Sequence, residues 1–307
     1  MSSITRVGSP AMESGGEIAV SLREVKAAGF EGLMLATALL QRARRADPRA
    51  GLWEAADVQW WWRKPQRSDE VAKLFWIDDE GPVAGVLLTS WTDDAWQCDP
   101  VIVPGAAGIE PGVVWSRSLE LAAQYAEQGF DVPVRDDDET FLKLAQRSGL
   151  TAGDRDSTAW MQAGDRPPVQ APPEGFVLVD RTQRHDAPHP MRHRNGDRVA
   201  QRLAQCPLYD PRLDLAIETA DGRIAGYSLY WFDPKTKVGL VEPVRVEDEF
   251  QRRGLGRAML TAGIARLVAS GAERVKISYE TDAAGALYQG VGFRWESSAT
   301  WYRAGPI

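Results

Sequence analysis

The chain repeats itself once, and this repeat constrains its fold more than any other feature. The second occurrence follows the first by 141 to 143 residues in a chain of 307 residues. The matching segments are Pro82–Val86 with Arg223–Tyr227, Asp99–Val103 with Glu242–Val246, Leu144–Leu150 with Leu287–Phe293, and Trp160–Gly164 with Trp301–Gly305. Each copy has the length of a typical domain. The repeat therefore predicts two copies of one fold.

A stretch with four prolines separates the two copies at residues 166–173. Proline clusters between patterned segments are typical of linkers. We therefore expect a first domain at residues 17–165, a linker at 166–173 and a second domain at 174–307. Residues 1–16 are rich in Ser and Gly and are expected to form a flexible leader.

Composition excludes several classes of protein. The content of 44% hydrophobic and 26% charged residues is that of a soluble globular protein, and no apolar run is long enough to span a membrane. The net charge of −7 argues against broad nucleic-acid binding. Two cysteines, Cys98 and Cys206, fit a reducing compartment, so we expect a cytoplasmic protein without nucleic-acid or membrane partners.

A glycine-rich turn in the second copy predicts a site for a phosphorylated ligand. An apolar run suited to one strand, residues 239–246, precedes the turn, and a helix is expected at about 257–270. Free N–H groups and the dipole at a helix N-terminus attract anions, and Gly254 and Gly256 would let an anion approach the backbone. Arg252, Arg253 and Arg257 could add charge-assisted hydrogen bonds. The alternative is an ordinary turn whose arginines face solvent.

Two motifs in this copy resemble the GCN5-related N-acetyltransferase (GNAT) superfamily. Residues 251–256 form Q-x-R-G-x-G, which is similar to the loop that holds the diphosphate of coenzyme A in that family. Residues 281–293 resemble the family's last motif, with Leu287-Tyr288 followed by Gly292-Phe293. Thr281 stands where the family usually has Asn, which puts one polar contact to the cofactor in doubt. The resemblance covers about residues 174–303.

The resemblance implies the fold class. The expected protein is α+β (an α/β sandwich), with two tandem GNAT-like domains. Each domain would be a mixed, mostly antiparallel sheet flanked by helices, in which the fourth and fifth strands separate to admit the pantetheine arm. In the first copy Gly108–Val113 replaces the glycine turn, Glu110 would repel a diphosphate, and Ala145 stands opposite Tyr288. We therefore expect a degenerate first domain, which packs against the second and contributes in part to its substrate pocket.

The resemblance also implies the cofactor site, which would hold acetyl-CoA without a metal. The backbone of Val244–Val246 would pair with pantetheine. The expected cofactor-binding residues are Val244, Arg245, Val246, Gln251, Arg252, Arg253, Gly254, Leu255, Gly256, Arg257 and Thr281. Three histidines, His185, His189 and His193, recur every fourth residue, but prolines at 188 and 190 break such a helix and argue against a metal site.

Two residues are expected to carry the chemistry of amide formation. Tyr288 matches the family tyrosine that protonates the leaving thiolate, with a packed aromatic residue as the alternative. Strand alternation predicts that Glu242, Val244 and Val246 share one face, which would bring Glu242 near the acyl group as a general base. A structural carboxylate is the alternative for Glu242, because Asp99 occupies the same place in the first copy.

We therefore predict an N-acyltransferase that moves an acetyl group from acetyl-CoA to a primary amine of a small molecule. The amine would attack directly in a ternary complex in the C-terminal domain of a monomer or homodimer. A protein acetyltransferase acting on lysines or N-termini, and a non-catalytic acyl-CoA sensor, are the alternatives.

The basic segment at residues 181–198 is expected either to hold an acidic group of the substrate or to be a solvated loop. The run Trp60-Trp61-Trp62 is expected in the core or between the domains, with an aromatic wall of the substrate pocket as the alternative.

Overall fold

The computed structural model of the chain describes residues 22–92 and 95–305. The leader predicted at residues 1–16 lies outside the described residues. In the first half the order of helices and strands is β1 (Arg23–Ala27), α1 (Gly29–Ala46), α2 (Ala55–Trp61), β2 (Lys73–Asp78), β3 (Gly81–Ser90), β4 (Trp96–Ile102), α3 (Pro111–Ala123), β5 (Phe130–Arg135), α4 (Glu139–Arg147) and β6 (Thr151–Gln162). In the second half the order is β7 (Phe176–Asp180), α5 (Arg192–Asn195), α6 (Val199–Gln205), β8 (Asp214–Thr219), β9 (Ile224–Asp233), β10 (Val238–Val246), α7 (Leu255–Ala269), β11 (Arg274–Tyr279), α8 (Asp282–Gly290) and β12 (Arg294–Ala304).

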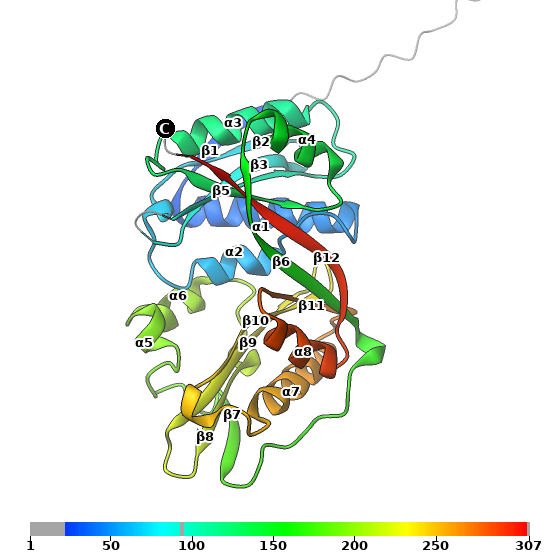
Figure 1. Cartoon of the computed structure of the whole chain (residues 1–307). Coiled ribbons are helices and arrows are strands. Elements are labelled where there is room, and N and C mark those ends of the chain that lie inside the picture. The colour runs from blue at the N-terminus through cyan, green and yellow to red at the C-terminus, as the bar shows by residue number, and fades with distance from the viewer. Residues whose placement is uncertain (1–21, 93–94, 306–307) are drawn as a thin grey trace, which may run out of the picture.

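The two halves have the same succession of elements, as the repeat predicted, and helices flank the sheet of each half (Figure 1). The predicted α+β class with mixed, mostly antiparallel strands is confirmed. Only the pairs β4–β5 and β10–β11 are parallel among the pairings of the described residues.

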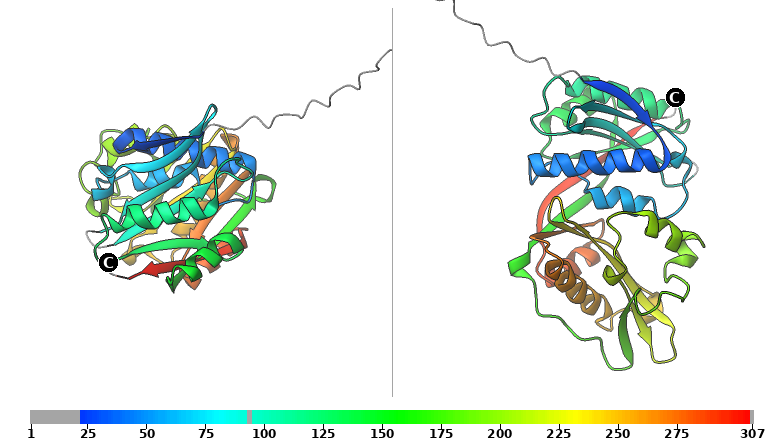
Figure 2. Two further views of the ribbon diagram at one scale, coloured as in Figure 1. Left: turned by 90° about the horizontal axis from the view of Figure 1, so that it is seen from above. Right: turned by 180° about the vertical axis from the view of Figure 1, so that it is seen from behind.

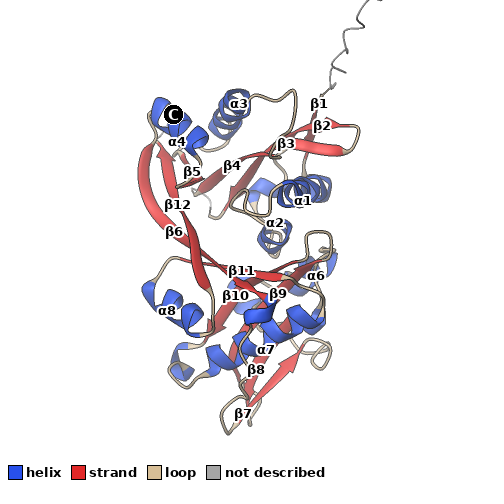
Figure 3. Cartoon of the chain, turned by 90° about the vertical axis from the view of Figure 1, so that its right-hand side faces the viewer, coloured by secondary structure: helices blue, strands red, loops and turns tan. Residues whose placement is uncertain are grey.

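The twelve strands form one continuous sheet, because the last strand of each half has moved to the other half. The strand order is β1-β2-β3-β4-β5-β12-β6-β11-β10-β9-β8-β7. Thus β12 lies between β5 and β6, and β6 lies between β12 and β11. Figure 1 shows β6 and β12 running from one half to the other, and Figure 3 shows them side by side. The repeat in the sequence identifies equivalent strands but not their partners, so this exchange was not predicted.

Both parallel pairs separate after a short stretch. Strand β10 pairs with β11 only at Val238–Leu240, and β4 pairs with β5 only at Trp96 and Gln97. Beyond these positions the facing edge of β10 has no strand partner within residues 22–92 and 95–305, so its backbone groups can bind an extended ligand. The separation of the fourth and fifth strands therefore occurs in both halves.

A shared core joins the halves through α2. Trp60 and Trp61 are buried in one hydrophobic cluster with Leu203 of α6 and Trp231 of β9. Figure 2 shows α2 on the side of the first half that faces the second. The predicted position of these tryptophans in the core or between the domains is confirmed. Among the described residues, no helix is both long and apolar enough to cross a membrane.

Helix α7, which carries the glycine turn at its N-terminus, packs closely on β9. Its Gly263 faces the buried ring of Tyr230, whose hydroxyl donates a hydrogen bond to the carbonyl oxygen of Met259 at 2.7 Å. A Cβ at Gly263 would lie 2.0 Å from ring carbon Cζ of Tyr230. Glycine at this position therefore sets how closely α7 approaches the sheet, and with it the position of the turn.

We predict that Gly263→Ala lowers the free energy of unfolding by about 2 to 3 kcal/mol, because an overpacked core must shift. The matched control is Gly112→Ala in α3, where a new Cβ meets nothing within 4 Å. That change should leave stability the same or raise it by less than about 1 kcal/mol. Chemical denaturation of the three proteins checks this, and equal stabilities would contradict the predicted packing.

Candidate active site

The glycine turn caps α7 with a backbone that an anion can approach. Gly254 is the N-cap residue of α7 and has φ 81°, in the left-handed region that glycine adopts easily. A Cβ on Gly256 would lie 3.4 Å from Cδ2 of Leu287, which is an ordinary contact. The packing of the protein therefore does not require glycine at position 256.

Several side chains of the turn are held in place, among them Arg253, whose Nη2 donates to the carbonyl oxygen of Glu249 at 3.3 Å. Gln251 Nε2 donates to the carbonyl oxygen of Val246 at 3.3 Å and to Asp248 Oδ1 at 3.0 Å, which ties the turn to β10. Leu255 is buried, so only its backbone can reach a ligand. The three predicted arginines, Arg252, Arg253 and Arg257, are all exposed at the turn. The N–H groups of the first turn of α7 lie beside them and have no intrahelical acceptor.

Thr281 has a local role at the start of α8. It is the N-cap residue, and its hydroxyl accepts a hydrogen bond from the N–H of Ala284 at 3.3 Å. A threonine at this position satisfies one of the free N–H groups of the helix. This explains why Thr is suitable where the family usually has Asn, and a contact of Thr281 with a cofactor remains a prediction.

The prediction that Glu242, Val244 and Val246 share one face is wrong, because β10 contains a β-bulge. Val241 lies opposite Tyr230 and Val244 opposite Ser228, so one extra residue lies between these two pairs. Val241 and Val244 therefore lie on the same face, toward α7. Val244 joins the cluster that contains Tyr288. Simple alternation fails at Glu242-Pro243.

Glu242 instead interacts with residues of α2 from the first half. Burial, and then the charge of Asp57, raise the pKa of its carboxyl group to about 7. The Arg63 guanidinium and a hydrogen bond from Trp60 oppose this shift. A carboxyl group with this pKa can exchange a proton near neutral pH.

Asp99, at the matching position in the first half, has a similar environment. It is 2% exposed, and burial raises its pKa to about 7. Trp53 Nε1 and Gln97 Nε2 donate to Asp99 Oδ1 at 2.7 and 2.9 Å. Asp99 faces a cavity of about 740 Å³ where β4 and β5 separate. A raised pKa is thus a property of this position in both halves and does not by itself identify a base.

Tyr288 of α8 lies close to Glu242. Its ring contacts those of Tyr279 and Phe293, with centroids 5.9 and 6.3 Å away. Burial, and then the charge of Glu242, raise its pKa to about 12, so the hydroxyl carries its proton at neutral pH. Within residues 22–92 and 95–305 this hydroxyl has no hydrogen-bond partner. It is therefore available to donate to a ligand. In the first half Ala145 is buried at the matching position.

The exchange of strands adds residues to this region that the sequence did not indicate. Strand β6 of the first half lies beside β11, and Thr158 Oγ1 is 3.4 Å from Ser278 Oγ. Asp156, also on β6, accepts a hydrogen bond from Trp301 Nε1 at 2.8 Å, and burial raises its pKa to about 6. A contribution of the first half to the substrate pocket was expected from the sequence, but no residue of β6 was expected at the site.

The basic segment at residues 181–198 is partly helical and mostly paired with carboxylates. Arg184 binds Glu218 and Arg192 binds Asp197. His189 is buried, and its Nε2 is 2.9 Å from Asp214 Oδ2, so its role is structural. No group of three potential metal ligands occurs in the part of the chain that the structure describes.

Comparison with known proteins identifies the family. The profile of the Acetyltransferase (GNAT) family matches residues 181–293. A mycothiol acetyltransferase of Clavibacter sepedonicus is 31% identical over 264 residues, which cover 76% of this chain and 85% of that protein. The chain belongs to the GNAT acetyltransferase family. A mycothiol acetyltransferase of Clavibacter michiganensis subsp. michiganensis is 37% identical over 109 residues, 35% of this chain, and the chain spans only 33% of that relative.

Solved structures agree on the tandem fold. The tandem GNAT protein from the clavulanic acid biosynthesis pathway superposes with a TM-score of 0.68 at 16% identity, over 94% of this chain and 99% of that one. A GCN5-related N-acetyltransferase from Sphaerobacter thermophilus gives a TM-score of 0.60 at 16% identity, over 92% and 95% of the two chains. The family resemblance read from the two motifs is therefore confirmed, as is the tandem arrangement.

We predict that Glu242→Gln stabilises the protein at pH 8 by about 1 to 3 kcal/mol, because the folded state then no longer buries a charge. The folded pKa of about 7 lies above the ordinary value of 4.5, so wild-type stability should fall as the pH rises between these values. The advantage of the variant should therefore grow from about pH 4.5 to about pH 7 and vanish below. Denaturation at pH 4.5 and pH 8 checks this, and a destabilised variant at pH 8 would contradict burial of Glu242.

Proposed function

We propose that the chain is an N-acetyltransferase that transfers an acetyl group from acetyl-CoA to a primary amine of a small molecule. One observation carries the proposal: the free hydroxyl of Tyr288 and the carboxyl group of Glu242 come together where β10 and β11 separate, below the glycine turn. Acetyltransferases of this family use acetyl-CoA, and the turn offers its diphosphate a set of N–H groups beside three arginines.

The proposed cofactor contacts follow the geometry of β10 and the turn. The edge of β10 at Val244, Arg245 and Val246 would pair with the pantetheine arm. The turn residues Gln251, Arg252, Arg253, Gly254, Leu255, Gly256 and Arg257 would surround the diphosphate, and Thr281 would lie near the arm at the start of α8. Because Leu255 is buried and Gln251 is bonded to β10, we assign binding by Leu255 to its N–H group and a positioning role to the side chain of Gln251.

The proposed reaction is a direct attack in a ternary complex. The amine nitrogen attacks the carbonyl carbon of the thioester, and the carbon–sulfur bond then breaks. Glu242, directly or through a water molecule, takes the proton that the amine loses. Tyr288 gives its proton to the leaving thiolate. The pKa of about 7 on Glu242 and of about 12 on Tyr288 suit a base and an acid, respectively, at neutral pH.

We propose that the first domain (residues 17–165) binds no acetyl-CoA and that the second (174–307), after the linker at 166–173, does the chemistry. In the first half Glu110 is the N-cap residue of α3 at the place of the glycine turn. A carboxylate at a helix N-terminus occupies the position where a diphosphate would bind and repels it.

Titration calorimetry with acetyl-CoA should therefore give one binding site per chain. Gly256→Glu should abolish that site, because the new side chain brings both bulk and negative charge to the turn. Gly112→Glu, the matched change at the helix start in the first half, should leave binding unchanged. Two sites per chain would contradict a degenerate first domain, and no binding at all would remove the proposed function.

We further predict that Tyr288→Phe lowers kcat by about 100-fold or more while the affinity for acetyl-CoA stays within about threefold. The assay measures release of free CoA thiol in the presence of a panel of primary amines. Glu242→Gln should also lose turnover, whereas Asp99→Asn, its counterpart in the first half, should not.

Each alternative has its own outcome in these assays. Full activity of Tyr288→Phe would contradict its role as the acid, and equal losses in Glu242→Gln and Asp99→Asn would indicate structural carboxylates. Acetyl-CoA binding without turnover of any amine or protein would favour a sensor. Acetylation of proteins but not of small amines would favour a protein acetyltransferase.

A further inference from the structure

Arg63 of the first half lies beside the candidate active site of the second. It follows α2 directly, and it is half-buried. Its Nε donates to Asn195 Oδ1 of α5 at 2.7 Å, and its Nη1 donates to the carbonyl oxygen of Trp60 at 3.0 Å. Its Cζ lies 3.8 Å from the centroid of the Trp60 ring. These three contacts fix the guanidinium and leave Nη2 unbonded among the described residues.

Arg63 differs from two arginines of the interior, each of which is bound directly to a carboxylate. Arg44 is paired with Glu54, and Arg202 with Asp69. Among the residues that the structure describes, no carboxylate lies within ion-pair distance of Arg63. A half-buried charge without a partner is costly to the folded protein. An anionic group of a ligand would remove this cost.

The surroundings of Arg63 connect it to the reacting groups. Burial lowers the pKa of the Arg63 guanidinium to about 10, and the nearby Glu242 and Tyr227 oppose this shift, so the group stays charged at neutral pH. Tyr227 lies directly opposite Arg245 in the β9–β10 pair. The guanidinium therefore lies near Glu242, on the face of β10 that is turned toward α2.

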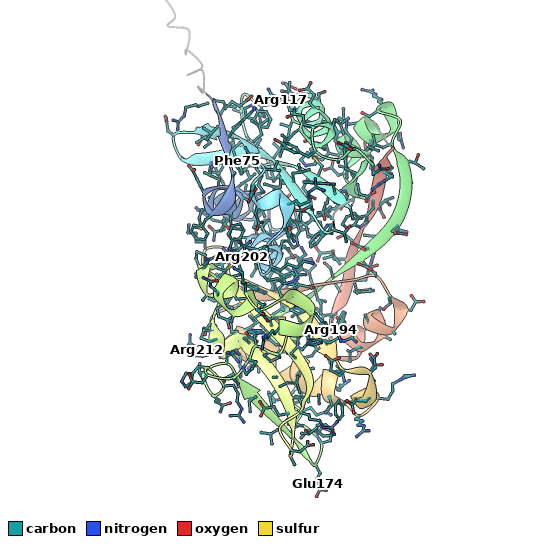
Figure 4. The ribbon with its side chains drawn as sticks, turned by 90° about the vertical axis from the view of Figure 1, so that its left-hand side faces the viewer. Phe75, Arg117, Glu174, Arg194, Arg202 and Arg212 are labelled. Carbon is teal, nitrogen blue, oxygen red and sulfur yellow. The ribbon has the colours of Figure 1, made fainter. Side chains whose placement is uncertain are left out.

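Two further arginines border the same place, but both have counterions. Arg194 binds Glu247 at 2.7 Å, and Arg245 binds Asp248 at 3.0 Å. Arg194 also hydrogen-bonds Tyr227. Figure 4 shows Arg194 near the level where the two halves meet. These neighbours add positive potential around Arg63, whereas Arg63 is the one of the three without a carboxylate partner in the described part of the chain.

We propose that Arg63 binds a carboxylate group of the acceptor, so that the substrate class is a primary amine that also carries a carboxylate, such as an amino acid or a short peptide. This inference rests on the proposed N-acetyltransferase function. The amine would face Glu242 while the carboxylate takes the free donors of Arg63, whose planar group suits bidentate binding. The first half would then supply the specificity of the reaction that the second half performs.

The test compares matched acceptors. Amino acids and dipeptides with a free C-terminal carboxylate are assayed beside their C-terminal amides, which have the same amine but no charge. Wild-type enzyme should prefer the carboxylates in kcat/KM, mostly through a lower KM. Arg63→Ala should reduce this preference by about 10-fold or more, and Arg63→Lys should restore part of it, because it keeps the charge but not the planar fork.

The control variant is Arg192→Ala, an exposed arginine of α5 that is paired with Asp197, and it should keep the wild-type preference. Calorimetry with acetyl-CoA shows that each variant is folded and loaded. Equal acetylation of amides and carboxylates by the wild type would overturn the inference and leave the proposed function standing.

A shifted pH profile in Arg63→Ala with an unchanged preference would also overturn the inference, because Arg63 would then act only on Glu242. If no amine of either kind is acetylated although acetyl-CoA binds, the proposed function falls, and this inference falls with it.

Discussion

The exchange of the last strands is the constraint on which the rest of the structure depends. Because β12 pairs with β5, and β6 pairs with β11, each half completes the sheet of the other. The backbone hydrogen bonds of these ladders hold the halves in a fixed relation, and the core around α2 then fills the space between them. Trp60 and Arg63 therefore reach the separated strands of the second half. A pair of domains joined only by a linker would not fix them there.

The separation of β10 from β11 and the bulge within β10 shape the candidate site together. The separation leaves a strand edge free for an extended ligand. The bulge changes the alternation, so that Val244 faces α7 and Tyr288 while Glu242 interacts with α2. The two proposed catalytic groups thus come from different surroundings, which is how two ionisable groups acquire separate pKa values.

Local patterns predicted the fold and the local structure around the glycine turn correctly. Short-range geometry determines the glycine turn, the helix that follows it and the helix that carries Tyr288. The residue types at positions 251–293 are therefore sufficient to predict these elements. The side of β10 on which Glu242 lies was predicted wrongly, because β10 contains a β-bulge. Such a bulge depends on the pairing of β10 with β9, which the local sequence does not show. Asp156 and Arg63 were not singled out as site residues, because nothing near them in the sequence carries a motif. They reach the site only through strand exchange and the contact of α2 with the second half.

The sequence by itself determined that the chain contains two copies of one fold, that only the second has the glycine turn for which phosphate binding is proposed, and that Ala145 stands opposite Tyr288 in the first copy. These features lie in short segments whose physical meaning is local: a backbone that needs glycine, a helix terminus that attracts an anion, a side chain that can or cannot donate a proton. Only the tertiary structure decided which half completes which sheet, which side of β10 Glu242 faces, and that no carboxylate of the described residues lies within ion-pair distance of Arg63. These depend on pairings between segments far apart in the chain, and local sequence does not encode them.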